Sequence, residues 1–541
     1  MLKKLNLTKN RALAATCGAG LALAVALTGC SSHSDSQSGS AGRPPEPPKI
    51  TIGDAFVYPT NLEVPGLTGQ RILSTTGSEA RWSYLPGEQP FNPALAALIG
   101  EHLQHQAAST GATYSPQAHD PSADLLNRGC VSGSTSRPAR EILDDPSLSL
   151  TPGAETQLTI TCEPVLAAGP TFGERLRFVR GNSSDVVSDF VEVLYTNTET
   201  GEVARGKDLV AESGLPALLD ALYTGLKLQR PMSGDEVLPP SPETLSDLAQ
   251  SIYNVGFSEN GDIHATVDGH FTSVLAAGDQ GYTPKSETLV IPAERAEELL
   301  TPLGASISAA QQSGAAWSGP APLKPGLEYV DCNLVPCVAV TYDDGPSPYT
   351  TQTVLDAYAG KPYAAATFFV LGENIAGNEA VLASEAAEGH LVANHSWNHP
   401  TFTTLSDEAI AAQVNDTSAA IEAATGVPVT YIRPPYGDMN ERTRAVAGLP
   451  TILWSIDTND WQQPGTDAIV SQVLSETVPD SIVLMHDIHE QTVAGAAQIV
   501  DGLLERGYTL VTVNQLFGGT SPDPTLFFWD TDAVRAARHQ R

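Results

Sequence analysis

The chain has 541 residues, 41% of them hydrophobic, which is enough for two to four domains with ordinary buried cores. Its 62 acidic residues outnumber its 29 basic residues, and the formal net charge is −33 at pH 7. The hydrophobic content argues against a wholly disordered chain. The acidity argues against nucleic-acid binding, because such binding requires a basic surface.

Residues 1–29 have the order of a secretory signal peptide. Four basic residues between Lys3 and Arg11 precede an apolar stretch, residues 12–28, and small residues follow. The Leu-Thr-Gly-Cys ending at Cys30 resembles a lipobox, which implies cleavage and lipidation at Cys30. Stable anchoring requires more than one acyl chain, so multiple acylation is implied. We therefore expect a lipid anchor in the cell membrane, with the protein on the extracytoplasmic face; an uncleaved N-terminal helix is the alternative.

Low-complexity segments divide the rest of the chain. Residues 30–49 and residues 313–329 are rich in Ser, Gly, Ala and Pro, which indicates a flexible tether and a linker. Residues 50–312 between them combine strand-like and helix-like patterns and predict an α+β accessory domain, or two small ones. The expected strands are Gln157–Cys162 and Phe190–Tyr195, and the expected helices are 214–228, 242–255 and 292–302.

Four cysteines remain after the signal region, an even number for an oxidising compartment. We pair Cys332 with Cys337 by their proximity and Cys130 with Cys162 by elimination. A zinc site is the competing interpretation, but these spacings contain no CxxC pair.

Residues 330–520 alternate regularly between strand-like and helix-like segments, and residues 521–541 are a C-terminal tail. Such alternation indicates parallel strands in a barrel-like or open α/β fold. The clearest helix is 407–424, which Ser406 can cap. The seven expected strands are Val338–Tyr342, Ala366–Val370, Leu391–Asn394, Thr430–Arg433, Ile452–Ile456, Ile482–Met485 and Tyr508–Val513.

Five polar clusters follow these strands, at the edge where parallel α/β barrels build active sites. Each cluster alone also has a plainer interpretation: a turn, a capping histidine pair, a rigid loop, a buried Trp with capping acids, or a core histidine. Their agreement in order and position favours a site. The clusters are TYDDGP (341–346), HSWNH (395–399), RPPYG (433–437), DTNDW (457–461) and LMHD (484–487).

The residue types in these clusters indicate metal-assisted hydrolysis. The adjacent Asp343 and Asp344 can point to different sides, so that one binds a metal while the other accepts a proton. His395 and His399 are four apart, and on a helical turn they would share one face as two ligands of one metal. His486 follows a buried strand and can donate a proton.

Together the five clusters resemble the polysaccharide deacetylase family with the NodB-homology domain, carbohydrate esterase family 4. The family pattern reads TFDDGP, HSxxH or HTxxH, RPPYG, DxxDW and LxHD, and the one departure is Tyr342 in place of Phe. The resemblance covers residues 330–520 and implies a distorted (β/α) barrel of about seven parallel strands. The pattern at the end of residues 50–312 is similar to the accessory domain of some bacterial peptidoglycan deacetylases.

The resemblance implies one divalent metal ion held by Asp344, His395 and His399. Zinc is the default for such N/O ligands, and cobalt, manganese or nickel ions are alternatives. Asp343 is then the general base for the attacking water. Arg433 would pair with Asp343 and keep it ionised, because an opposite charge lowers a carboxyl pKa.

The remaining roles concern the leaving group and the substrate pocket. The metal and the backbone N–H of Tyr436, which the rigid Pro434 segment positions, would stabilise the oxyanion. His486 would protonate the leaving amine. Asp460, or less favourably Asp457, would orient His486. The apolar pocket for the acetyl methyl would be formed by Leu484 and Trp461.

The expected activity is removal of N-acetyl groups from amino sugars of a cell-surface polysaccharide. Peptidoglycan N-acetylglucosamine or N-acetylmuramic acid is the expected substrate, because a tethered protein faces the wall. Chitin oligosaccharides and O-acetylated xylan are alternative substrates, and a non-catalytic wall-binding module is the alternative function. The expected partners are this glycan and the membrane; protein partners cannot be inferred.

Overall fold

The computed structural model describes residues 47–148, 156–182, 184–229, 240–275, 285–519, 527–528 and 531–539. The predicted signal peptide, Cys30 and nearly all of the predicted tether lie outside these residues. Within the described ranges, no helix combines the length and the apolar character that a membrane span requires.

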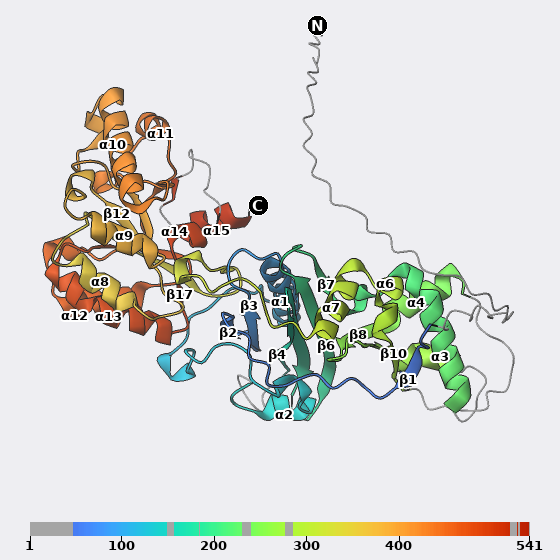
Figure 1. The fold of residues 1–541 in the computed structure, drawn as a ribbon. Coiled ribbons are helices and arrows are strands. Elements are labelled where there is room, and N and C mark those ends of the chain that lie inside the picture. The colour runs from blue at the N-terminus through green and yellow to red at the C-terminus, as the bar shows by residue number, and fades with distance from the viewer. Residues whose placement is uncertain are drawn as a thin grey trace, which may run out of the picture. The chain divides into compact units, whose positions relative to one another are not determined.

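A six-stranded sheet forms the first half of the N-terminal part (Figure 1). Its strands are β2 (Thr68–Ser74), β3 (Ser78–Tyr84), β4 (Gln157–Ala168), β5 (Thr171–Gly181), β6 (Val186–Asn197) and β7 (Val203–Arg205), in that spatial order. Helix α1 (Phe91–Ser109) buries Leu95, Ile99 and Leu103, which recur every four residues and therefore share one face. They belong to the same hydrophobic cluster as Phe172 and Leu176 of β5.

A four-stranded antiparallel sheet follows, in the order β1-β10-β9-β8. Its strands are β1 (Thr51–Gly53), β10 (Glu287–Ile291), β9 (Ile263–Val267) and β8 (Ile252–Phe257). The helices of the N-terminal part, besides α1, are α2 (Ala139–Asp144), α3 (Leu215–Gln229), α4 (Pro242–Ser251), α5 (Gly269–Leu275), α6 (Ala296–Leu299) and α7 (Pro302–Ser313). Residues from β6 and β8 share one hydrophobic cluster, and the Tyr195 hydroxyl donates to the carbonyl of Val255 across 2.8 Å.

Two helices expected in this part end earlier than the sequence indicated. The helix expected at 242–255 stops at Ser251, because residues from Ile252 pair with β9 and bury Ile252, Val255 and Phe257. The segment 292–302 contains only a 3₁₀ turn and the short α6, and α7 begins at Pro302.

A parallel sheet in the order β13-β12-β11-β16-β15 organises the C-terminal part, and β17 pairs with β11. Its strands are β11 (Cys337–Asp343), β12 (Thr367–Val370), β13 (Leu391–Asn394), β15 (Ile456–Asp457), β16 (Ser481–His486) and β17 (Thr509–Leu510). The helices along this part are α8 (Thr351–Tyr358), α9 (Glu379–Ala387), α10 (Asp407–Thr425), α11 (Glu441–Ala447), α12 (Thr466–Glu476), α13 (Glu490–Glu505) and α14 (Val513–Leu516). Ser406 caps α10 as expected, accepting a hydrogen bond from the Ala409 amide.

Three expected strands differ in this sheet. The strand expected at Tyr508–Val513 is reduced to β17, because Thr512 caps α14 and Val513 begins it. Residues 430–433 form no strand and contribute only isolated parallel bridges, from Ile432 to Asn394 and to Thr451. The strand expected at 452–456 splits into β14 (Thr451–Ile452) and β15. The carbonyl oxygens of Ile452 and Leu453 accept hydrogen bonds from the Arg433 side chain, so Arg433 occupies groups that a continuous ladder would use.

The predicted C-terminal tail contains two described elements. The strand β18 (Phe527–Phe528) pairs in parallel with β14, and the helix α15 (Thr531–His539) follows it. The structure also contains both expected disulfides, Cys130–Cys162 and Cys332–Cys337. Because β11, β15 and β16 are parallel and end at Asp343, Asp457 and His486, their polar ends meet at one edge of the sheet.

Candidate active site

A cavity of about 440 Å³ opens at this edge of the parallel sheet. All five sequence clusters contribute to its wall, although they are spread over more than a hundred residues of chain. Its volume lies within the range of small-ligand sites. The lining residues are Asp343, Asp344, His395, His399, Pro434, Tyr436, Trp454, Asp457, Trp461, Leu484 and His486.

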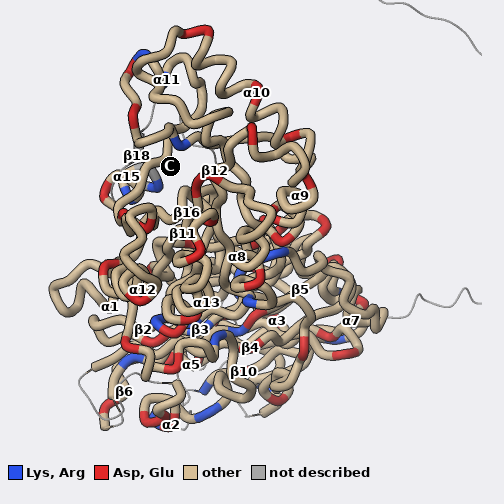
Figure 2. Tube along the Cα trace, turned by 90° about the vertical axis from the view of Figure 1, so that its left-hand side faces the viewer, with Lys and Arg blue, Asp and Glu red and all other residues tan. Residues whose placement is uncertain are grey.

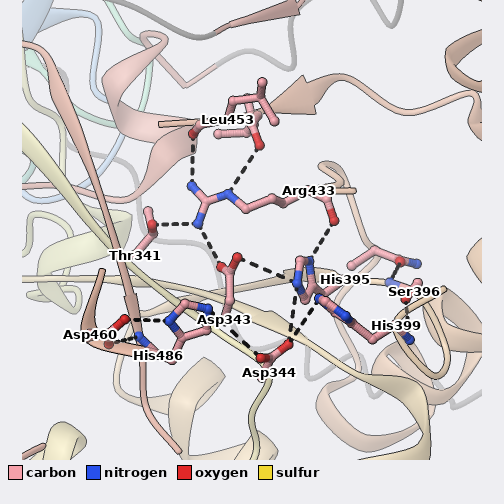
Figure 3. A network of polar contacts seen from close by, with 12 residues as sticks. Thr341, Asp343, Asp344, His395, Ser396, His399, Arg433, Leu453, Asp460 and His486 are labelled. Atoms are coloured by element: carbon pink, nitrogen blue, oxygen red, sulfur yellow. Dashed lines mark hydrogen bonds and ion pairs between the residues drawn. The ribbon is translucent and has the colours of Figure 1, made fainter. Parts of the chain in front are cut away.

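Asp344, His395 and His399 form a group that fits a divalent cation. Their potential ligand atoms all lie within 4.8 Å of one another. Oδ1 of Asp344 is 3.5 Å from Nε2 of His395 and 3.7 Å from Nε2 of His399 (Figure 3). This Oδ1 is buried and accepts no hydrogen bond from the described residues, so the donor set is one carboxylate and two imidazoles converging on one point. Such a set matches zinc and related ions.

The two histidines come from a loop and not from a helical turn. His395 directly follows β13, and no helix contains His395 or His399. The expected helical face is therefore wrong, and tight backbone turns bring the rings together. Asp344, Ser396 and His399 have φ values of 72°, 77° and 60°, a region that non-glycine residues rarely adopt. Such conformations concentrate where a site over-determines the backbone.

Arg433 contacts both Asp343 and His395. Its Nη1 donates to Oδ1 of Asp343 across 2.7 Å and to the Thr341 hydroxyl across 2.7 Å. Its backbone carbonyl lies 2.7 Å from Nδ1 of His395, an arrangement that leaves Nε2 of His395 facing Asp344. The guanidinium also lies 4.2 Å from the centre of the Phe369 ring. The predicted pairing of Arg433 with Asp343 is therefore present.

The pKa of the Asp343 carboxyl shifts in the direction opposite to the expected one. Burial raises the pKa of Asp343, and the charge of Arg433 opposes this rise without cancelling it. The expectation of a lowered value considered the opposite charge but not the loss of water around both groups. Burial also lowers the pKa of His395 to about 3, so this imidazole is neutral, as a metal ligand must be.

His486 and Asp460 form a second pair on the other side of the cavity. Nδ1 of His486 lies 2.7 Å from Oδ1 of Asp460, and the His486 amide donates to Oδ2 across 2.8 Å. Burial alone would lower the pKa of His486, but the hydrogen bond and charge of Asp460, with Asp343 and Asp344, raise it to about 9. The structure thus favours Asp460 over Asp457 as the orienting partner.

Two contributors were not found from the sequence. The Thr492 hydroxyl donates to Oδ2 of Asp460 across 2.6 Å, and it lies in the first turn of α13, 32 positions along the chain. Trp454 lines the cavity and lies 5.6 Å from the Arg433 guanidinium. The only signal for Trp454 was an aromatic residue within the strand expected at 452–456, and Thr492 had no signal.

The outer wall of the cavity is aromatic. Tyr436 and Trp461 are 69% and 57% exposed although both line the cavity, whereas Leu484, which also lines it, is buried. Tyr436 has a φ of 61°, a conformation that a non-glycine residue rarely adopts. Exposed aromatic faces beside a polar centre suit the stacking of sugar rings.

Comparisons with known proteins match this part of the chain. The family model described as polysaccharide deacetylase matches residues 331–449. The peptidoglycan-N-acetylglucosamine deacetylase PgdA of Listeria monocytogenes is 38% identical over 196 residues, covering 36% of this chain and 42% of that protein. The chain therefore matches less than half the length of that relative.

This chain matches almost the whole length of a shorter relative and of a solved structure. A chitooligosaccharide deacetylase of Rhizobium leguminosarum bv. trifolii is 38% identical over an alignment of 196 residues that covers 33% of this chain and 90% of that protein. The structure of peptidoglycan deacetylase PdaC from Bacillus subtilis is 36% identical, covers 39% of this chain and 96% of that chain, and has a TM-score of 0.34. The chain belongs to the polysaccharide deacetylase family.

Proposed function

We propose that this protein is a metal-dependent hydrolase that removes N-acetyl groups from amino sugars of a cell-surface polysaccharide. One observation carries the proposal: three kinds of group line a single cavity. They are the buried carboxylate of Asp343, the possible metal ligands Asp344, His395 and His399, and the histidine His486, which a carboxylate orients. The five motifs belong, on this proposal, to a distorted barrel of about seven parallel strands.

Asp343 is the base of the proposed reaction. It lies 2.7 Å from Nη1 of Arg433 and uses Oδ1 for this contact, which leaves Oδ2 toward His395 at 3.6 Å. A carboxyl whose pKa is raised by burial accepts a proton from water more readily than an exposed one. Arg433 holds this carboxylate in place while the proton moves.

His486 is the acid. Its Nδ1 is engaged by Asp460, so Nε2 is the atom that carries a proton toward the cavity. With a pKa raised to about 9, the ring is protonated at neutral pH and can deliver this proton to the leaving sugar nitrogen. The backbone N–H of Tyr436 is the donor for the oxyanion, since its residue lines the same cavity.

Asp344, His395 and His399 would hold the divalent cation, with zinc as the proposed ion. When bound, such a cation supplies polarisation of the acetyl carbonyl and acidification of a water molecule. Leu484 and Trp461 surround the acetyl methyl, and the exposed ring of Tyr436 faces the sugar.

Peptidoglycan is the proposed substrate, and an anchor at Cys30 on the extracytoplasmic face is the proposed location. The identity to PgdA supports the substrate, and the signal-like N-terminus supports the location. The identity to a chitooligosaccharide deacetylase supports chitin oligomers as the second candidate. The presence of base, acid and ligand groups in one cavity argues against a purely wall-binding role.

Mass spectrometry of muropeptides and chitin oligomers after incubation with the zinc-loaded protein tests the proposal. We expect a loss of 42 mass units per acetyl group removed, the mass of C₂H₂O, together with free acetate. The Asp343→Asn variant is the control, because it keeps the cavity shape but removes the base. A zinc-loaded protein that releases no acetate from any N- or O-acetylated glycan would contradict the proposal.

A further inference from the structure

A second cavity, of about 590 Å³, lies in the N-terminal part of the chain. We call it the basic groove, because four of its lining residues are cationic: Arg175, Arg177, Arg205 and Lys207. Lining residues from β5, β6, β7 and β8 form its walls, so strands of the six-stranded and four-stranded sheets both contribute. Its volume is as large as that of a small-ligand site.

The charge of the basic groove is opposite to that of the chain. Acidic residues outnumber basic ones by 62 to 29 in the whole protein, and in Figure 2 they are spread over the described part of the trace. The groove is lined by four cations and by two carboxylates, Asp189 and Glu192. Such a local reversal attracts anions toward the groove while the rest of the surface repels them.

The two carboxylates neutralise only half of these cations. Asp189 pairs with Arg177 at 2.7 Å, and Glu192 pairs with Arg205 at 3.3 Å. Arg175 and Lys207 form no ion pair within the described residues. Arg175 donates to the hydroxyls of Thr135 and Ser136 instead.

Arg175 also carries an unsatisfied donor. Its Nε is buried and has no hydrogen-bond partner among the described residues. A buried guanidinium nitrogen without an acceptor leaves Arg175 incompletely compensated by the protein. Lys207 has an exposed side chain and adds to the groove lining a second cation without an ion pair among the described residues.

Two exposed aromatic rings complete the groove. Phe190 on β6 is 37% exposed and Tyr253 on β8 is 43% exposed, although both line the cavity. Phe190 is held in place by stacking on Phe178, with ring centres 4.8 Å apart and an interplanar angle of 6°. Aromatic rings that line one cavity together with guanidinium groups fit a ligand that has both flat apolar sugar faces and carboxylates.

We propose that the basic groove binds a carboxylate-bearing glycan strand, with its cations on the carboxylates and its aromatic rings on the sugars. This rests on the proposed function and sharpens it. Peptide-substituted peptidoglycan carries carboxylates, whereas chitin is neutral. The groove therefore directs the enzyme to the acidic polymer and retains the chain on it while the catalytic cavity acts.

Sedimentation of the full chain with insoluble polymers tests this inference. The polymers are peptidoglycan sacculi freed of phosphodiester polymers, which we call the untreated sacculi, the same sacculi with their carboxyl groups converted to amides, and chitin particles. We expect salt-sensitive binding to the untreated sacculi and about tenfold weaker binding to the other two. Equal binding to untreated and amidated sacculi overturns the inference. A fourth sample, sacculi that retain their phosphodiester polymers, is measured beside them, and binding to this sample alone also overturns the inference.

Substitutions locate the binding within the groove. Lys207→Glu combined with Tyr253→Ala should weaken binding to untreated sacculi about tenfold, because a charge is reversed and a stacking face is lost. Lys207→Glu alone changes only an exposed side chain and serves if the double variant does not fold. The matched control is Lys49→Glu, an exposed lysine outside the groove lining, which should change binding by less than about twofold. Unchanged binding of the folded groove variants overturns the inference.

Acetate release by the unsubstituted chain is measured in parallel. Groove-dependent binding without acetate release overturns the proposed activity and leaves the groove assignment standing. Acetate release with groove-independent binding overturns the groove assignment alone.

Discussion

Arg433 and Asp343 form an ion pair inside the protein, with Nη1 donating to Oδ1 across 2.7 Å and side-chain exposures of 0% and 3%. The same guanidinium donates to the carbonyls of Ile452 and Leu453, and the Arg433 carbonyl positions His395. The broken strand, the proposed base and a proposed metal ligand therefore all depend on one residue.

Arg433→Lys should disturb both stability and activity. An ammonium group cannot reproduce the planar fork that serves Asp343, Thr341 and two carbonyls at once. We expect the free energy of unfolding to fall by about 3 kcal/mol, and kcat/KM for acetate release to fall about 100-fold. Denaturant unfolding and kinetics measure the two effects. Arg442→Lys is the matched control, because the Arg442–Asp407 pair is exposed; equal effects of both substitutions would contradict the assigned role.

His395→Ala should abolish metal binding at the catalytic cavity. It removes one of three converging donors, and the remaining pair leaves Oδ1 of Asp344 with a single histidine at 3.7 Å. We expect zinc content measured by mass spectrometry, and acetate release, to fall at least about 100-fold. The exposed His270 in α5 provides the control, His270→Ala, which should retain both. Normal zinc content and activity in His395→Ala would show that the ligand set is wrong.

Asp460→Asn should shift the alkaline limb of the pH–rate profile. Asp460 raises the pKa of His486, and His486 acts as an acid only while protonated, below its pKa of about 9. Removing the negative charge lowers this pKa, so activity should be lost at a lower pH, by about one unit or more. Profiles of kcat/KM from pH 6 to 10 measure the shift. Asp457→Asn is the comparison; a shift with Asp457→Asn and none with Asp460→Asn would favour the other carboxylate.

Glu174 should make stability fall as the pH rises. Burial raises the pKa of Glu174 from 4.5 to about 8, although the Ser83 amide donates to it across 3.0 Å. The folded-state value lies above the unfolded one, so the protonated carboxyl stabilises the fold fully below pH 4.5, and this stability is lost as the pH rises toward 8. The loss should be on the order of a few kcal/mol. Denaturant unfolding at pH 5 and pH 8 should show a smaller difference in Glu174→Gln than in the unsubstituted chain; an equal difference would contradict this assignment.

The two disulfides should differ in their contribution to stability. Cys130–Cys162 closes a loop with a sequence separation of 32, whereas Cys332–Cys337 has a separation of 5. The loop-entropy relation gives about 4 kcal/mol for the first and about 2 kcal/mol for the second. Thermal and denaturant unfolding of the two paired Cys→Ser variants measure the contributions. A larger loss from the short loop would show that loop entropy does not dominate.

Sequence reasoning was accurate for β13, which the structure places at Leu391–Asn394 as expected, and close for β11, β12 and β16. These strands are buried apolar runs that end in polar clusters, so their residues carry the signal themselves. The strand predicted at 430–433 was wrong, because strand formation there depends on how the neighbouring segment at Thr451 pairs. Ile432 forms only isolated bridges, and Arg433 binds the carbonyls that would continue the ladder.

The sequence by itself identified the candidate groups that the structure brings together in one cavity. The residues Asp343, Asp344, His395, His399 and His486 could be named because parallel strands with polar ends meet at one edge of a sheet. Only the tertiary structure decided what depends on burial and on distant partners. It brought Thr492 onto Asp460, reversed the expected direction of the Asp343 pKa, and gathered the basic groove from separate strands. Desolvation and long-range contacts act between segments that the order of residues does not connect, so they arise only when the chain is folded.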